Sequence, residues 1–237
     1  MAIPKRPEPL EPWVESAAEA GDVAAMKLLG QYFYETGSQG SAPAERWLLA
    51  AAEAGDAEAM YSLTSVHHDR AVNATPHGKA HSLKAAFWCR RAAQAGWIPA
   101  IHSMHAYAAD QDEREFWLRK AVASGDPWAP SNLAHVLDEL GRVSDAEHWY
   151  SRATREPGGI GLSARESLGD FLLRQGRLEE AAECWRQLAE AGEPAGAWHR
   201  AYVLELLGRP EEAAASRQQG DALQAAERAR EPDCPEW

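Results

Sequence analysis

The sequence has few cysteines and no long apolar run. Its three cysteines, Cys89, Cys184 and Cys234, are scattered and form no metal-binding spacing, as is usual in a reducing compartment. No stretch approaches the roughly 20 apolar residues that a transmembrane helix needs. No apolar segment follows Lys5 and Arg6, as it would in a secretion signal. We therefore predict a cytoplasmic protein with no membrane partner.

Positive charge and catalytic motifs are also scarce. Lys and Arg total 24 against 36 Asp and Glu, which gives a formal net charge of −12. An acidic chain is a poor candidate for binding the phosphate backbone of nucleic acids, so we expect no nucleic-acid partner. The GxxxxGK[ST], GxSxG and HExxH motifs are all missing from the sequence. We predict no enzymatic activity, no cofactor and no metal site.

The histidines leave one alternative open. His102 and His105 are spaced i, i+3, and His77 and His81 are spaced i, i+4. Helical pairs at these spacings can share a metal ion. His105, however, falls where two helices are expected to cross, and His77 and His81 flank Gly78 in a predicted loop. A His-based metal-binding protein or enzyme is therefore the less favoured alternative.

What the chain does contain is a repeated pair, a tryptophan followed four residues later by an alanine. Residues i and i+4 lie on one face of a helix, and the methyl side chain leaves room for a neighbouring helix. The pair recurs at intervals of 29 to 41 residues, which is typical of stacked helical repeats. We predict that the helical core contains Trp13/Ala17, Trp47/Ala51, Trp88/Ala92, Trp117/Ala121, Trp149/Ala153 and Trp185/Ala189.

Helix ends and helix crossings are marked by glycine. Eight residues after four of the tryptophans stand Gly21, Gly55, Gly96 and Gly125, and three of these glycines precede Asp22, Asp56 and Asp126. Glycine ends a helix in the left-handed conformation, and aspartate caps the next helix. The following helix then places a large residue beside a small one, as at Leu29-Gly30 and Leu168-Gly169. We expect the helices of each hairpin to cross at these small residues.

These features resemble the Sel-one-like repeat family and its relatives, the tetratricopeptide repeats. The segment ERWLLAAAEAGDAEAMYSL matches the Sel-one-like form, and SLGDFLLRQGRLEEAAECW matches the tetratricopeptide form. The resemblance implies an all-α protein, a right-handed α-solenoid of about six helix-turn-helix repeats with capping helices. It also implies a binding function, that of an adaptor or scaffold for a protein or an extended peptide.

The resemblance divides the chain into four parts. Residues 1–12 form a flexible Pro-rich tail, 13–126 the Sel-one-like repeats, 127–230 the tetratricopeptide-like repeats with a C-terminal capping helix, and 231–237 a second flexible tail. Within them we expect a long loop at 70–81, a candidate hinge at 157–159 and a separate last helix at about 222–230, after Gly220-Asp221.

In tetratricopeptide-like stacks, the first helix of each repeat lines a concave groove. Carried over to this sequence, the partner-binding positions are Lys27, Gln31, Tyr34, Tyr61, Ser65, His68, His102, Ser131, His135, Glu166, Asp170, Arg174, Trp198, Tyr202 and Glu205. Aromatic and adaptable polar side chains favour protein contacts. Lys27 is the one fixed charge in the N-terminal half of this set, which predicts a neutral to basic surface there. A peptide-responsive regulatory sensor and a homo-oligomer stay open as alternatives.

Overall fold

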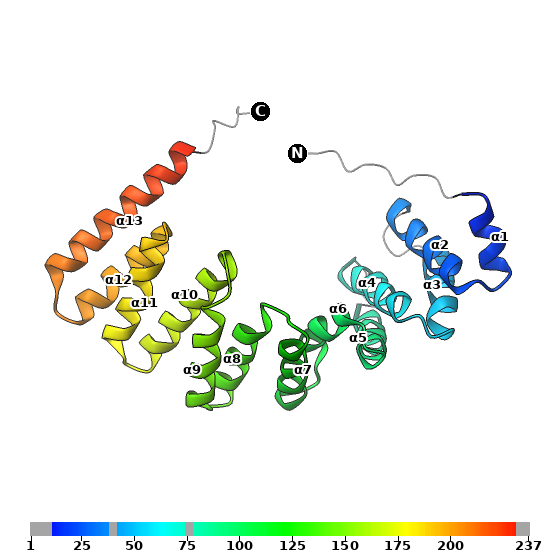
Figure 1. The fold of residues 1–237 in the computed structure, drawn as a ribbon, viewed down its shortest axis with the longest axis horizontal. Coiled ribbons are helices and arrows are strands. Elements are labelled where there is room, and N and C mark those ends of the chain that lie inside the picture. Colours follow the sequence, from blue (N-terminus) through cyan, green and yellow to red (C-terminus); the bar gives the residue numbers. More distant parts are fainter. Residues whose placement is uncertain (1–10, 38–41, 74–77, 231–237) are drawn as a thin grey trace. The chain divides into compact units, whose positions relative to one another are not determined.

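The computed structural model describes residues 11–37, 42–73 and 78–230 (Figure 1). This part of the chain folds into thirteen α-helices and one 3-10 helix, with no strand among the described residues. Most of both predicted tails, at 1–10 and 231–237, and His77 lie outside the described residues. The prediction of an all-α helical-repeat solenoid is confirmed.

The helices fall into two compact units, Met1–Gly125 and Asp126–Trp237. The first unit contains α1 (Trp13–Glu19), α2 (Val23–Thr36), α3 (Ala42–Glu53), α4 (Ala57–Asn73), α5 (Gly78–Gln94), α6 (Ile98–Ser103), η1 (Met104–Tyr107) and α7 (Gln111–Ala123). The second contains α8 (Ala129–Glu139), α9 (Val143–Ala153), α10 (Gly159–Arg174), α11 (Leu178–Glu190), α12 (Pro194–Leu206) and α13 (Pro210–Arg230). Within each unit, successive helices pack against each other as hairpins, for example α4 on α5 and α12 on α13.

The predicted helix ends are present, with the expected local chemistry. Gly55 has a φ of +99°, a conformation that residues with a side chain rarely adopt, and α4 begins two residues later at Ala57. The Asp56 carboxylate accepts a hydrogen bond of 2.8 Å from the backbone N–H of Ala59. Asp22 does the same for Ala25, at 2.9 Å. The Gly-Asp pair therefore ends one helix and caps the next.

Four of the six predicted Trp/Ala pairs place their ring in the core. Trp47, Trp88, Trp117 and Trp185 are between 1% and 9% exposed. Trp185 of α11 packs its ring 5.3 Å, centroid to centroid, from the ring of His199 in α12. The alanine one turn after each of these rings is buried as well.

Two of the pairs were predicted wrongly. Trp13 is 60% exposed, and its neighbour Val14 enters the core in its place. In α9 the fully buried ring belongs to Tyr150, while Trp149 is only partly buried. The cause in α9 is visible in the contacts, because Tyr150 shares a hydrogen bond of 2.8 Å with His135 Nδ1 and lies against Phe171. The helix face that turns inward is one residue away from the predicted one.

The long loop predicted over 70–81 is also wrong for the residues that the structure describes. Helix α4 continues to Asn73 and α5 already begins at Gly78. Arg70 forms an ion pair with Glu45 of α3. The ring of His81 stacks on that of His67, with centroids 5.7 Å apart. These packing contacts keep both segments helical, and only 74–77 lie outside the description.

The predicted separate last helix does not exist, because α13 passes through Gly220-Asp221 without a break. A Cβ at Gly220 would lie 2.5 Å from Nε1 of Trp198 in α12. The indole N–H of Trp198 donates a hydrogen bond of 3.2 Å to Asp221 Oδ1. The same dipeptide that ends helices elsewhere therefore serves here as a close contact between two helices.

The close helix crossing at Gly169 can be tested by mutation, and Gly159 in the same helix provides the control. A Cβ at Gly169 would lie 2.6 Å from Nε1 of the buried Trp185 ring, whereas a Cβ at Gly159 in the same helix meets nothing within 4 Å. We expect Gly169→Ala to lower the free energy of unfolding by roughly 1–3 kcal/mol through overpacking. Gly159→Ala is expected to leave it unchanged or raise it by up to about 1 kcal/mol. Urea unfolding followed by circular dichroism measures both, and equal effects would contradict the close crossing.

Candidate functional site

Four of the predicted partner-binding residues meet at one hollow in the first unit. It encloses about 230 Å³ and lies among three successive first helices of the repeats, α2, α4 and the α6–η1 segment. We call it the tyrosine hollow and define it by its lining residues, Tyr34, Tyr61, Thr64, Ser65, His68, Asp69, Ser103 and Tyr107. Tyr34, Tyr61, Ser65 and His68 were predicted, and the other four were not.

The hydroxyl groups of the hollow are held by hydrogen bonds between neighbouring repeats. Tyr34 of α2 donates its hydroxyl hydrogen to the Asp69 carboxylate of α4. The Tyr61 hydroxyl lies 2.9 Å from Ser103 Oγ of α6. Ser103 itself donates to the carbonyl oxygen of Pro99 at 2.9 Å. Because a hydroxyl has one hydrogen to give, Tyr61 is the donor in its bond with Ser103.

Burial raises the pKa of two phenols of the hollow, Tyr34 and Tyr107. It raises the pKa of Tyr34 to about 12, and the hydrogen bond to Asp69 and the charge of Asp69 act in the same direction. Burial, followed by the neighbouring Cys89 and Tyr61, also raises the pKa of Tyr107. Tyr34 therefore remains a hydrogen-bond donor to the Asp69 carboxylate throughout the neutral pH range.

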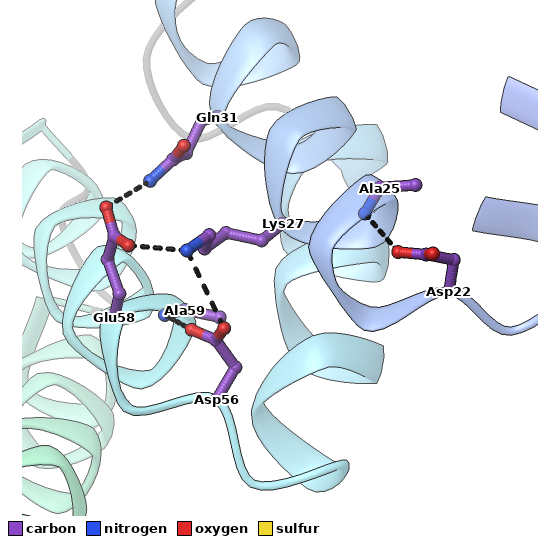
Figure 2. Close-up of polar contacts among 7 residues, drawn as sticks. All are labelled: Asp22, Ala25, Lys27, Gln31, Asp56, Glu58 and Ala59. Atoms are coloured by element: carbon purple, nitrogen blue, oxygen red, sulfur yellow. Dashed lines mark hydrogen bonds and ion pairs between the residues drawn. The ribbon is translucent and has the colours of Figure 1, made fainter. Parts of the chain in front are cut away.

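Lys27 and Gln31, which are predicted to contact a partner, form contacts within the chain that join α2 to α4 (Figure 2). Lys27 Nζ donates to Glu58 Oε2 at 2.5 Å and lies 3.7 Å from Asp56 Oδ2. Gln31 Nε2 donates to the other oxygen of Glu58 at 3.2 Å. The hydrogen bond from Lys27 lowers the pKa of Glu58, despite an opposing effect of burial. The pair is thus charged at neutral pH.

These contacts change the predicted charge of this surface. Lys27 was expected to be its one fixed charge, which made it neutral to basic. The structure neutralises Lys27 with Glu58 and Asp56, and it places the carboxylate of Asp69 in the hollow. The expectation of a neutral to basic surface is therefore wrong for this part of the first unit.

The other predicted residues lie apart from the hollow, and several are held by contacts within the chain. His102 Nε2 lies 3.0 Å from Ser124 Oγ in the third repeat. In the second unit, Arg174 donates to Asp138 at 2.6 Å, while Glu205 pairs with Arg217. The contacts of His135 with Tyr150 and of Trp198 with Asp221 are given above. Tyr202 is 54% exposed.

Glu166 belongs to a second, smaller hollow of about 190 Å³ in the second unit. It forms between α10, the end of α11 and the start of α12, and its lining residues are Gly159, Leu162, Ser163, Glu166, Leu188, Glu193 and Ala195. The lining is mostly apolar or small, and its two carboxylates are the only charged groups in it. It offers fewer specific contacts than the tyrosine hollow.

Thr64, Asp69, Ser103 and Tyr107 were missed in the prediction. For Asp69 a signal existed, because Tyr61, Ser65 and Asp69 are spaced i, i+4, i+8 and so form one row along α4. Ser103 and Tyr107 belong to the next repeat, where an α-helix gives way to the 3-10 helix η1. The position of Ser103 and Tyr107 depends on how two repeats pack, and the residue spacing within one helix does not reveal that packing.

Among residues 11–37, 42–73 and 78–230, no three His, Cys, Asp or Glu side chains are grouped so that they can hold a metal ion. A search of the same residues finds no helix that is both long and apolar enough to span a membrane.

Comparison with known proteins shows the same helical-repeat fold in other structures. A tetratricopeptide repeat model matches residues 131–183 and 167–221. The Sel1 repeat protein from Oxalobacter formigenes aligns with a TM-score of 0.66 at 19% identity, over 89% of this chain and 65% of that structure. The protective antigen c5321 of uropathogenic Escherichia coli, described as displaying an SLR fold, aligns with a TM-score of 0.59 at 19% identity.

That second alignment covers 89% of this chain and 54% of the antigen, so the chain spans between half and two-thirds of these two structures. A structure of MamA aligns with a TM-score of 0.53 at 14% identity, over 64% of this chain and 93% of MamA. No curated protein sequence matches the chain. The resemblance is therefore confirmed: the chain has the fold of the Sel1 and tetratricopeptide repeat proteins, and its residues 131–221 match the tetratricopeptide repeat model.

Proposed function

We propose that this protein is an adaptor or scaffold that binds another protein or an extended peptide at the tyrosine hollow. The observation that carries the proposal is the convergence of Tyr34, Tyr61, Ser65 and His68 from successive repeats on one concave site. Partly buried tyrosines with polar neighbours are the side chains that dominate protein interfaces. Hydrogen bonds between repeats hold Tyr34 and Tyr61 in place before a partner arrives, which lowers the entropy cost of binding.

The two cysteines that the structure describes are poor candidates for a catalytic nucleophile. A nucleophilic cysteine needs a lowered pKa and access to solvent. Burial raises the pKa of Cys89 to about 12, and it also raises that of Cys184. Neither thiol is therefore activated at neutral pH, and both are suited to packing.

A peptide library displayed on phage tests the proposal directly. We expect selection on the full-length protein to yield peptides that no longer bind after Ser65→Trp, because the indole would fill the tyrosine hollow. Ser144→Trp is the matched control, since Ser144 is exposed on α9 and lies outside both hollows. The affinity of each selected peptide for the three proteins is measured by fluorescence anisotropy, with circular dichroism as a check on folding. Peptides that bind all three proteins equally would exclude the hollow as the binding site.

Replacing Tyr202 tests, in the same assay, which of the two units binds the peptide. Tyr202 is the most exposed aromatic of the predicted partner-binding set in the second unit. If Tyr202→Ala removes peptide binding and Ser65→Trp does not, the partner binds the second unit instead.

The cytoplasmic location, homo-oligomer formation, the peptide-responsive sensor and the hinge at 157–159 stay predictions, as does the division of the chain into two repeat types.

A further inference from the structure

We propose that the tyrosine hollow binds the side chain of a lysine or arginine in the partner segment. This inference rests on the proposed function and names the chemistry that the hollow recognises. Three features of the site carry it: the direction of its hydrogen bonds, its charge, and the aromatic rings in its lining.

The hydrogen bonds of the hollow leave it rich in acceptors. Tyr34 donates to Asp69, and Tyr61 donates to Ser103. Ser103 donates to a backbone carbonyl, as does Thr64 at 3.4 Å. The hydrogens of Tyr34, Tyr61 and Ser103 are thus directed to protein acceptors, which leaves the lone pairs of these hydroxyls for a ligand, while the hydroxyls of Ser65 and Tyr107 can donate or accept. Lysine and arginine side chains carry three and five N–H donors and no acceptor, so they match such a surface.

The charge of the lining also favours a positively charged ligand. Asp69 supplies a carboxylate, and none of the eight lining residues is a lysine or arginine. The nearest lysine on the preceding helix, Lys27, is held by Glu58 and Asp56. A carboxylate or phosphate of a partner would meet like charge here, whereas an ammonium or guanidinium group would form a charge-assisted hydrogen bond.

The aromatic rings offer a second attraction for a cation. On the second helices of the repeats, the chain covers its own rings with cations: Arg46 lies 4.7 Å from the centroid of Trp47, and Lys120 lies 5.0 Å from that of Trp117. Of the cation–ring contacts found among the described residues, none involves Tyr34, Tyr61 or Tyr107. All three rings line the hollow, so a cation bound there would lie beside them.

The size of the hollow suits one side chain. Pockets for drug-sized ligands and cofactors usually have volumes of about 300–1,000 Å³. The tyrosine hollow encloses about 230 Å³, which is enough for the end of a lysine or arginine but small for a whole cofactor. A peptide would thus lie across the first helices and insert one basic side chain.

Tyrosine ring signals provide the test, because the chain has only six tyrosines. The full-length protein with ¹³C-labelled tyrosine is titrated with N-acetyl-lysine methylamide, N-acetyl-arginine methylamide and N-acetyl-glutamate methylamide. We expect the two basic probes to shift the signals of Tyr34, Tyr61 and Tyr107 but not that of Tyr202. The acidic probe is expected to shift none of them at the same concentration. Equal shifts with the basic and acidic probes would overturn the proposal.

Asp69→Asn removes the charge but keeps an oxygen that accepts the Tyr34 hydrogen bond. We expect it to weaken binding of the basic probes by about tenfold or more, as for the loss of one charged hydrogen bond. Asp112→Asn is the matched control, because Asp112 is exposed on α7 and outside the hollow. It removes the same charge from the protein and is expected to leave probe affinity unchanged. Identical affinities of the two variants would show that Asp69 does not recognise the cation.

The phage selection separates this inference from the proposed function. Enrichment of lysine or arginine among peptides that bind the wild type and not Ser65→Trp supports both. Peptides that need the hollow but contain no basic residue would overturn the inference and leave the proposed function standing. Binding of the basic probes with no selected peptide would contradict the proposed function and confirm only the hollow's preference for cations.

Discussion

Replacing Trp185 by alanine is expected to cost about 3–5 kcal/mol of the free energy of unfolding. Its ring is 1% exposed and lies between Gly169 of α10 and His199 of α12. The gap left by the indole cannot close, because three helices are held at distances set by that ring. Since a whole domain is stabilised by only about 5–15 kcal/mol, this single change should unfold much of the second unit at moderate temperature.

Urea and thermal unfolding followed by circular dichroism measure the effect, and two other tryptophans serve as controls. Trp128, in the same unit, immediately precedes α8 and is 50% exposed, and Trp13 of α1 is 60% exposed. Their replacement by alanine is expected to change the free energy of unfolding by no more than about 0.5 kcal/mol. A loss of several kcal/mol at Trp13 would show that the sequence-based assignment of its ring to the core was right and the structural one wrong.

The helix ends and crossings were predictable because their chemistry is local. A positive φ at Gly55 needs a glycine, and the Asp56 carboxylate reaches the N–H of Ala59 within the same turn. The crossing at Gly169 needs no more than a missing side chain opposite a large ring. In each case the residue type and its spacing along one helix already contain the physical requirement.

The inward-facing residue at the first repeat was not predictable in this way. Trp13/Ala17 and Val14/Ala18 have the same i, i+4 spacing, so either pair could face the core. The packing of α1 on α2 decides the matter, and it buries Val14 and Ala18. Gly220 was unpredictable for the same reason. The Gly220-Asp221 dipeptide has the same residues as the Gly-Asp pairs that end helices, but Gly220 packs against Trp198 inside a helix.

The candidate site was predictable to the extent that it follows single helices. Tyr61, Ser65 and His68 share one face of α4, and the positions carried over from the repeat family identified them. Contacts between repeats were not predictable, because the register of one helix against the next determines them. This is why Ser103 was missed as the acceptor from Tyr61, and why Lys27 was expected to contact a partner although Glu58 and Asp56 bind it.

Stability should also fall sharply between neutral and mildly acidic pH because of His67. This side chain is 2% exposed, and burial lowers its pKa from 6.5 to about 4. Glu45, 3.7 Å from Nε2, opposes the shift, while the charges of Lys84, Arg70 and His81 reinforce it. The unfolded chain binds a proton here below about pH 6.5 and the folded chain does not, so stability is lost as the pH falls toward 4. At about 1.4 kcal/mol per pKa unit, the loss approaches about 3 kcal/mol.

The measurement is urea unfolding at pH 7 and pH 4.5 for the wild type, His67→Gln and His68→Gln. Acidic groups with lowered pKa values, such as Glu58 and Glu113, also make the folded protein less stable as the pH falls. Their contribution is the same in all three proteins. We expect the difference in unfolding free energy between the two pH values to shrink by about 2–3 kcal/mol in His67→Gln alone. His68 is exposed on the same helix, so its replacement should leave the difference intact. If His67→Gln kept the full pH dependence, the buried imidazole would not be its source, and the packing of α3, α4 and α5 around His67 would have to admit water.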